Sequence, residues 1–344
     1  MPSACRRSTA IAFLACAVLS PAWADITSAE LLEDFGLTPD EIAELENGEV
    51  LAFSDEEIEF SKRELATDAM VQVDTDHSAI LLALKEDATL IPVKLLQEFH
   101  TITDESDFAG VELTEDNFAE VEKLFGSKLG KEFNLSAGEI TTVQRILEPH
   151  RGGTRAQMIE AASTAMRAVL KGRYNAYRSS GIAGIEPYQR SSRKQVDIGA
   201  ELQLTNNAAA VYRDEFPEFV RVLGAYPEGA ECCEHEYRWL KVRIRKRHAF
   251  ALAHTIILST DDFAIITERH FYISNTLNSV QITVLWLPHG DKGSIGLAMS
   301  ASADVLDSVM GRMLRGVGRN LAKDMVTDAM IDIRDDLEAK SHDD

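Results

Sequence analysis

The last third of the chain constrains the fold most, because two different periodicities follow one another there. In HEYRWLKVRIRK, residues 235–246, the apolar side chains Leu240, Val242 and Ile244 alternate with cationic ones. Alternation with period two is typical of an antiparallel strand with one buried face. Four more segments rich in β-branched and aromatic residues follow, separated by short turn-like stretches. The spacing predicts an antiparallel meander of five strands, over residues 235–246, 248–259, 263–274, 279–287 and 294–302.

The period then changes to that of a helix. From Val305 to Leu337, apolar residues recur every three to five positions, while charged residues such as Arg312, Lys323 and Asp332 occupy the other side. This pattern predicts an amphipathic helix, and about 30 residues of helix span roughly 45 Å, enough to cross a whole sheet. The predicted fold class is therefore α+β. It consists of an antiparallel β-meander packed on a long C-terminal helix, preceded by a helix-rich acidic N-terminal region.

A curved antiparallel sheet that holds a long C-terminal helix resembles the helix-grip fold of START-like lipid-binding and polyketide-cyclase proteins. The resemblance covers about residues 217–337 and lies in the order of the elements. It implies a cavity between the sheet and the helix that takes an apolar or amphipathic small molecule. The chain as a whole is also similar to uncharacterised exported bacterial proteins.

The first 24 residues have the three parts of an export signal. Two arginines at positions 6 and 7 form the positive start, residues 10–19 form a short apolar core, and Ala22-Trp23-Ala24 provides a small-x-small cleavage site. The apolar core is too short to cross a membrane as a helix. We therefore expect a periplasmic or secreted protein, cleaved after Ala24, with no integral membrane segment in the mature chain.

Charge and length limit the partners and the number of domains. The formal net charge of −21 becomes −23 when the two arginines of the signal are removed. A chain this acidic repels nucleic acids and anionic lipid surfaces, so we expect no nucleic-acid partner. The remaining 320 residues (344 − 24) suffice for about two domains. The predicted division is a signal peptide at 1–24, an acidic α+β region at 25–150, a helical connector at 151–230, and the sheet with its C-terminal helix at 231–340.

Cysteine is sparse. Cys5 and Cys16 belong to the predicted signal, which leaves the adjacent pair Cys232 and Cys233. Adjacent cysteines cannot close an ordinary disulfide loop. In an oxidising compartment they form a strained vicinal disulfide, pair between the subunits of a homo-oligomer, or stay free as two small residues at the start of a strand.

No cofactor, metal or nucleophile motif stands out. His235-Glu236 lacks the second histidine of a zinc-protease helix, and Gly316-x-Gly318 lies inside the predicted helix without the third glycine of a dinucleotide loop. The acidic run at residues 104–122 is more typical of a solvated face than of a metal site. We predict no cofactor, no metal and no assigned catalytic residue, and the sequence favours a non-enzymatic role without deciding it.

The densest polar and aromatic cluster lies on the third predicted strand of the meander. Because alternate residues of a strand share a face, Glu268, His270 and Tyr272 are predicted to lie together. If that face lines the cavity, these groups orient the head of a ligand; if it faces water, they have no such role. On the C-terminal helix, Met313 and Val317 are the predicted apolar ligand contacts.

Histidines give a second candidate cluster. His235, His248, His254 and His270 fall on neighbouring predicted strands. They converge as a metal or acid–base group, or they are ordinary strand residues. The sequence alone does not choose between these interpretations.

Three functions stay open. The first is binding or carrying an apolar or amphipathic small molecule in the sheet–helix cavity, which we favour. The second is a structural or protein-interaction module, which predicts an open apolar stripe on the C-terminal helix. The third is an enzyme in the same cavity, with His270 or Glu268 as general acid or base. That function requires one of them to be buried within about 3 Å of a partner, with a perturbed pKa.

Overall fold

The computed structural model describes residues 26–53, 64–76, 78–82, 89–126, 128–208, 210–244, 246–290, 293–303 and 315–341. Within these residues its centre is an antiparallel sheet of eight strands, in the order β1-β2-β10-β9-β8-β7-β6-β3. The five strands expected from the C-terminal alternation are consecutive neighbours in this sheet, which confirms the meander. They are β6 (Glu234–Ile244), β7 (Arg247–Ser259), β8 (Ala264–Ile273), β9 (Ser279–His289) and β10 (Gly293–Ala303).

Three strands from the N-terminal region complete the sheet. At one side β2 (Glu64–Val73) pairs with β10, and β1 (Leu51–Phe53) pairs with β2. At the other side β3 (Leu96–Thr101) pairs with β6. Segments on both sides of the predicted boundary at residue 150 therefore share one sheet, and the helices between β3 and β6 form a long insertion in it.

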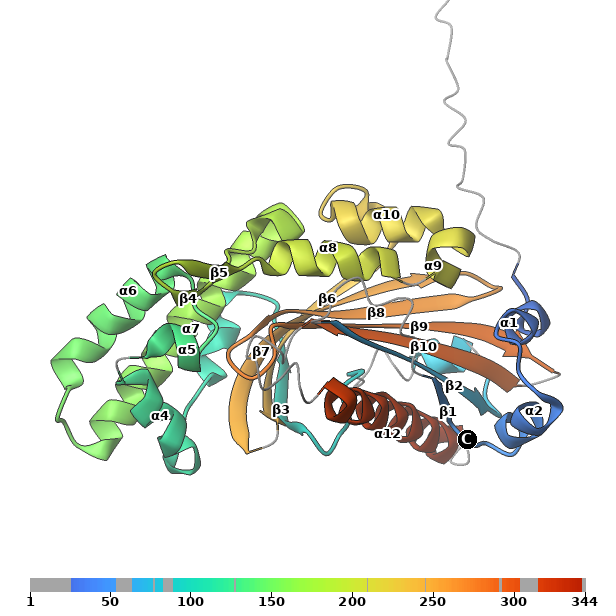
Figure 1. The fold of residues 1–344 in the computed structure, drawn as a ribbon, viewed down its shortest axis with the longest axis horizontal. Coiled ribbons are helices and arrows are strands. Elements are labelled where there is room, and N and C mark those ends of the chain that lie inside the picture. The colour runs from blue at the N-terminus through green and yellow to red at the C-terminus, as the bar shows by residue number, and fades with distance from the viewer. Residues whose placement is uncertain are drawn as a thin grey trace, which may run out of the picture.

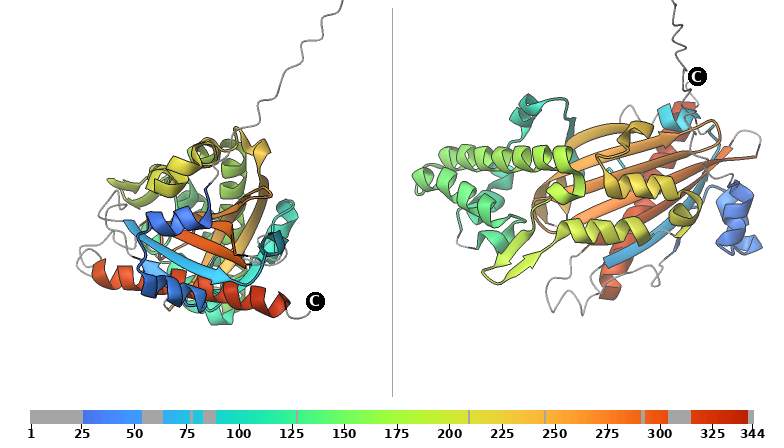
Figure 2. Two further views of the ribbon diagram at one scale, coloured as in Figure 1. Left: turned by 90° about the vertical axis from the view of Figure 1, so that its right-hand side faces the viewer. Right: turned by 90° about the horizontal axis from the view of Figure 1, so that it is seen from above.

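One face of the sheet, here called the α12 face, carries the C-terminal helix α12 (Arg315–Ser341). Figure 1 and Figure 2 show this helix crossing the strands obliquely. Val326, Met330, Ile333 and Leu337 lie three or four residues apart and are buried in one apolar cluster with strand residues. The predicted long C-terminal helix is confirmed. Its expected first part, residues 305–314, lies outside the described residues.

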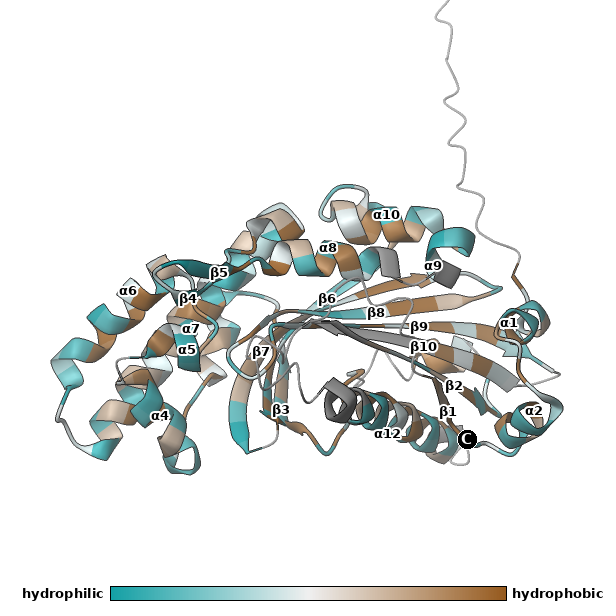
Figure 3. Cartoon of the chain, in the orientation of Figure 1, coloured by the Kyte–Doolittle hydropathy of each residue, from teal (hydrophilic) through white to brown (hydrophobic). Residues whose placement is uncertain are grey.

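The opposite face of the sheet, here called the helical face, is covered by several helices (Figure 1). Phe216, Phe219 and Leu223 are buried there against the strand residues Ile265 and Leu285. Figure 3 shows apolar residues both on the strands and on the helices that cover them. The covering helices are α7 (Arg155–Ser180), α8 (Ile198–Ala208), α9 (Ala210–Glu215) and α10 (Pro217–Ala225).

The remaining elements lie at the two ends of the molecule (Figure 1). Beside α7 at one end are α4 (Phe118–Leu124), α5 (Leu129–Glu132) and α6 (Ala137–Leu147), with a hairpin of β4 (Tyr188–Ser191) and β5 (Lys194–Val196). At the other end are α1 (Ser28–Asp34) and α2 (Pro39–Glu46). Thr27, Thr38, Ser136 and Thr154 begin α1, α2, α6 and α7 with reciprocal capping boxes, which explains where those helices start.

The acidic run at residues 104–122 has structural partners. Several of its carboxylates form ion pairs with cationic side chains of α7, so the run lies along that helix. A further member, Glu120, is buried and pairs with Arg247 of β7 at 2.6 Å. The pairs with α7 are Glu105–Lys171, Glu112–Arg167 and Glu115–Arg155.

Candidate functional site

Glu268 and His270 of β8 form a buried pair on the α12 face. Each is 1% exposed. The carboxylate oxygen Oε1 of Glu268 lies 2.6 Å from Nε2 of His270. A carboxylate only accepts hydrogen bonds, so Nε2 of His270 carries the hydrogen and donates. Any further hydrogen bond of the His270 ring must therefore use its other nitrogen, Nδ1.

A segment of the N-terminal region reaches across the α12 face and holds the carboxylate. The hydroxyl of Thr89 donates to Oε1 of Glu268 at 2.9 Å, and the backbone N–H of Leu90 donates to Oε2 at 3.0 Å. A few residues later, the backbone N–H of Val93 donates to Asp332 of α12 at 2.8 Å, and Lys94 pairs with Asp328. This segment therefore links the buried pair to the C-terminal helix.

These contacts fix the ionisation of Glu268. Burial by itself raises the pKa of the carboxyl group. The hydrogen bond and electrostatic attraction from His270, with the hydrogen bonds from Leu90 and Thr89, outweigh burial and hold the pKa of Glu268 below its ordinary value. The site therefore contains a buried carboxylate whose two oxygens are both occupied.

Three buried polar atoms on the same α12 face have no hydrogen-bond partner within the described part of the chain. They are Oγ1 of Thr67, Oγ1 of Thr255 and Nε1 of Trp286. Thr255 is the cross-strand partner of Glu268. The row continues through Ile282 and Ser300 to Thr67 on β2. Because buried polar groups in native proteins almost always bond to protein or water, this row is a place where water or a ligand can bind.

Small side chains flank the row. Ala249, Ala251 and Ala253 occupy three successive positions of β7 that face α12, and all three are buried in the same apolar cluster. Trp286 lies flat over Gly296, where a Cβ atom would come within 2.5 Å of the indole ring. The α12 face thus combines shallow apolar positions with unpaired polar atoms.

Tyr272 does not lie with the pair, and its predicted place is wrong. Ala253 pairs with His270 but Leu252 pairs with Tyr272, so β8 contains one extra residue at a β-bulge. The extra residue turns Tyr272 onto the helical face, where it is packed beside Tyr188 and Arg173. Arg269 lies on the helical face, opposite Glu268.

The two predicted helix contacts cannot be placed. Met313 lies outside the described residues, and for Val317 only the backbone of α12 is described. The residues that sequence reasoning missed are Thr89, Leu90 and Thr255. Leu90 acts through its backbone N–H, which leaves no sequence signal, whereas the alternation of β7 would have placed Thr255 on the face of Ala253.

Two of the four predicted histidines converge, but on the helical face. Nε2 of His254 lies 2.9 Å from Nδ1 of His235, and Nδ1 of His254 lies 2.9 Å from the hydroxyl of Tyr177 on α7. His248 instead bonds to Gln97, and His270 to Glu268. The described residues contain no group of three or more histidine, cysteine or acidic side chains placed to hold a metal ion.

The contacts of His235 and His254 form a hydrogen-bonded chain with a single direction. Arg269 only donates, and it donates from Nη1 to the hydroxyl of Tyr177 at 3.2 Å. At the other end, the carbonyl of Ala230 only accepts, and it lies 2.8 Å from Nε2 of His235. Each member therefore donates to the next, from Arg269 through Tyr177, His254 and His235 to Ala230. We call these five residues the histidine chain.

Beside the histidine chain, the pair Cys232 and Cys233 lies in the turn between α10 and β6. Their Sγ atoms are 2.7 Å apart and both thiols are free. Cys232 is exposed and Cys233 is half-buried. The pair thus occupies the predicted place at the start of a strand.

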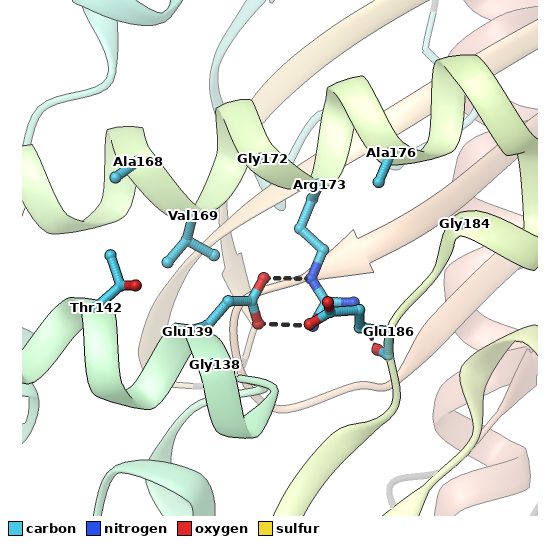
Figure 4. A pocket seen from close by; sticks show the side chains of 10 residues that line it. All are labelled: Gly138, Glu139, Thr142, Ala168, Val169, Gly172, Arg173, Ala176, Gly184 and Glu186. Atoms are coloured by element: carbon cyan, nitrogen blue, oxygen red, sulfur yellow. Dashed lines mark hydrogen bonds and ion pairs between the residues drawn. The ribbon is translucent and has the colours of Figure 1, made fainter.

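A groove of about 390 Å³ lies between α6, α7 and the segment around Gly184 (Figure 4). At its base Glu139 binds the Arg173 guanidinium through both oxygens, at 2.6 and 2.7 Å. The remaining nitrogen of Arg173, Nη1, donates to the carbonyl of Glu186. These groups satisfy one another, so the ion pair holds α6, α7 and the following segment together.

The sequence matches no protein-family model and no curated protein. In the described part of the chain, none of the helices has the length and apolarity that crossing a bilayer requires.

Proposed function

We propose that this protein binds a small apolar or amphipathic molecule between the sheet and α12. The polar head of the ligand meets Nδ1 of His270 and the hydroxyl of Thr255, and its apolar part lies over the alanines of β7. The proposal includes an exported location, as the N-terminal signal predicts, and a cavity of the kind that the START-like resemblance implies.

The proposal rests on the hydroxyl of Thr255, which has no hydrogen-bond partner among the residues that the structure describes and lies beside the occupied carboxylate of Glu268. A buried hydroxyl without a partner costs about 1–3 kcal/mol, which a ligand or bound water offsets. The neighbouring Glu268 needs no ligand, since both its oxygens already accept hydrogen bonds. The proposed head group therefore meets Thr255, whose hydroxyl has no partner in the described part of the chain, and Nδ1 of the neighbouring His270, an arrangement that suits a hydroxyl or carboxyl head.

The packing of α12 argues against a module that offers this helix to a partner protein. In its described part, Val326, Met330, Ile333 and Leu337 are all at most 6% exposed. An interaction stripe would be open in the monomer. The apolar side of this half of α12 is already used by the sheet.

Mass spectrometry under native conditions tests the proposal. The protein is purified without detergent and measured before and after extraction with organic solvent. We expect a stoichiometric extra mass that extraction removes, and the extract identifies the ligand class. A protein without extra mass that also fails to take up fatty acids or other amphipathic molecules would refute the proposal.

A pair of threonine variants makes the test specific. Thr255→Val removes the unpaired hydroxyl, so we expect about 2- to 10-fold weaker ligand binding with little loss of stability. The matched control is Thr267→Val, on the helical face, whose hydroxyl bonds to Thr283 at 2.9 Å. This control should lose about 1 kcal/mol of stability and keep its affinity. Equal affinities of the two variants would contradict the assigned position of the head.

One observation favours catalysis as a second function of the same site. Glu268 fixes the imidazole of His270 with Nε2 as donor, which leaves Nδ1 able to take a proton from a bound molecule. This arrangement meets the requirement set by the sequence, a buried group within about 3 Å of a partner with a perturbed pKa. Chemical change of the extracted ligand by the wild type, and not by His270→Gln, would establish it.

A further inference from the structure

The two thiols of the turn that carries Cys232 and Cys233 differ in their exposure to solvent. Residues Ala230–Cys232 form one turn of 3-10 helix, which follows Gly229 at φ 72°. Cys232 is exposed at the end of the turn, and its Sγ lies 3.6 Å from the carbonyl of Gly229. Cys233 begins the extended backbone that leads into β6 and is half-buried. A solvent-borne reagent therefore meets Cys232 first.

The surroundings reinforce this difference. The guanidinium of Arg221 interacts electrostatically with Cys232 and reaches over the turn, where a Cβ atom on Gly229 would lie 3.4 Å from its Nη1. Burial, together with the neighbouring Cys232, raises the pKa of the Cys233 thiol. Cys233 consequently reacts slowly with disulfides in solution. Its Sγ, however, is only 2.7 Å from that of Cys232.

We propose that Cys232 and Cys233 form a thiol–disulfide exchange site, in which Cys232 reacts with a small disulfide and Cys233 resolves the product. The substrate class is a low-molecular-weight disulfide such as oxidised glutathione. This role is independent of ligand binding at the α12 face, since the two places lie on opposite sides of the sheet.

The exchange is balanced in two steps. The Cys232 thiolate attacks one sulfur of the small disulfide, forms a mixed disulfide, and releases one small thiolate, which takes up a proton. Cys233 then loses its proton to solvent and attacks Sγ of Cys232, which breaks the mixed disulfide and releases the second small thiol. Two protein thiols are oxidised to one vicinal disulfide, while one small disulfide is reduced to two thiols.

Ring closure acts directly on the end of the histidine chain. The carbonyl of Ala230 accepts hydrogen bonds from the backbone N–H of Cys233 at 3.1 Å and from Nε2 of His235 at 2.8 Å. A vicinal disulfide changes the backbone between residues 232 and 233, because the eight-membered ring fits few conformations. Oxidation of the pair therefore alters the turn whose Ala230 carbonyl accepts the hydrogen bond from His235.

The test equilibrates the purified full chain with mixtures of reduced and oxidised glutathione, quenches with acid, alkylates free thiols, and measures intact mass. We expect both thiols to disappear together, giving an unalkylated monomer lighter by two hydrogens, and the reduced form to return with excess thiol. Two thiols that stay alkylatable in excess oxidised glutathione would overturn the proposal. So would oxidation that yields only disulfide-linked dimers.

Single-cysteine variants test the order of the two thiols. Cys233→Ser should accumulate the mixed disulfide of glutathione on Cys232, because the resolving thiol is gone. Cys232→Ser should react at least about ten-fold more slowly, since the remaining thiol is half-buried with a raised pKa. Equal rates in the two variants would overturn the assigned order. Circular dichroism confirms that each variant is folded, and the wild-type mass measurement does not depend on either.

Discussion

His254 is held neutral by its neighbours on three elements. Burial is the main cause of a pKa well below the ordinary histidine value, and the electrostatic influence of His235 on β6 and Arg269 on β8 adds to it. Tyr177 of α7 bonds to His254, and the rings of Tyr226 and Tyr237 pack against it. A proton on His254 would also reverse its hydrogen bond with Tyr177, because Nδ1 would then donate to a hydroxyl that already accepts from Arg269.

The depressed pKa of His254 predicts a loss of stability in mild acid. Below pH 6.5, the ordinary histidine value, His254 binds a proton in the unfolded chain but not in the folded chain. The free energy of unfolding therefore falls as the pH drops, by up to about 1.4 kcal/mol per pH unit for this one group. Urea denaturation between about pH 7.5 and 5 measures the slope.

The control is His254→Gln, which keeps a donor and an acceptor but does not titrate. Its slope over the same pH range should be smaller than that of the wild type, and an unchanged slope would assign the effect to other groups. Titration of Glu268 does not contribute to the slope in this pH range, because its pKa is lowered from 4.5. Its contribution is fully present above that value and is lost only at lower pH.

A single extra residue in β8 decides which side chains share a face. Strict alternation predicted that Tyr272 would lie with Glu268 and His270. The bulge between His270 and Tyr272 changes the face of the sheet to which Tyr272 points. Two adjacent aromatic residues, Phe271 and Tyr272, both point to the helical face. Neighbouring large apolar residues do not reveal the bulge, because Ile265 and Ile266 are also adjacent in β8, where the pairing is regular.

The strands of the meander and the C-terminal helix were predictable because their periodicity is strong and local. The predicted segment 248–259 corresponds to β7 (Arg247–Ser259), and 279–287 corresponds to most of β9 (Ser279–His289). The contacts of Thr89 and Leu90 with Glu268 were not predictable, since they join residues about 180 positions apart. One donor is a common hydroxyl and the other is a backbone N–H, a group that every residue except proline carries.

The packing of α12 gives a second prediction. Met330 is 1% exposed within the apolar cluster of the α12 face, so Met330→Ala should lower the free energy of unfolding by about 2–5 kcal/mol. Asp324 on the same helix is exposed, and Asp324→Ala should change it by less than about 0.5 kcal/mol. Chemical denaturation compares the two variants, and similar values would mean that α12 does not contribute to the core.

The sheet as a whole joins the two halves of the chain. β2 pairs with β10 over ten residue positions, from Glu64–Ala303 to Val73–Ser294, and β3 covers the outer edge of β6. No local pattern indicates which distant strands pair, so sequence reasoning placed these strands in a separate N-terminal region. The division into domains at residues 150 and 230 stays a prediction that a fragment can test.

A fragment of residues 231–344 should not fold on its own. It keeps the meander and α12 but lacks β1, β2 and β3, which leaves β6 and β10 as long unpaired edges. Such edges promote aggregation. Thermal unfolding followed by circular dichroism compares the fragment with the chain that begins at residue 25. Cooperative unfolding of the fragment at a similar temperature would instead support an independent C-terminal domain.

The pairing of β2 with β10 also determines when the molecule can become native. Met70 meets Leu297 in that pair, so a ribosome must complete nearly the whole polypeptide before the two partners coexist. Contacts between such distant residues are slow to form. A newly made chain therefore stays without its completed sheet for nearly the whole of its synthesis, and the edges of β6 and β10 have no partner strands until β2 and β3 pair with them.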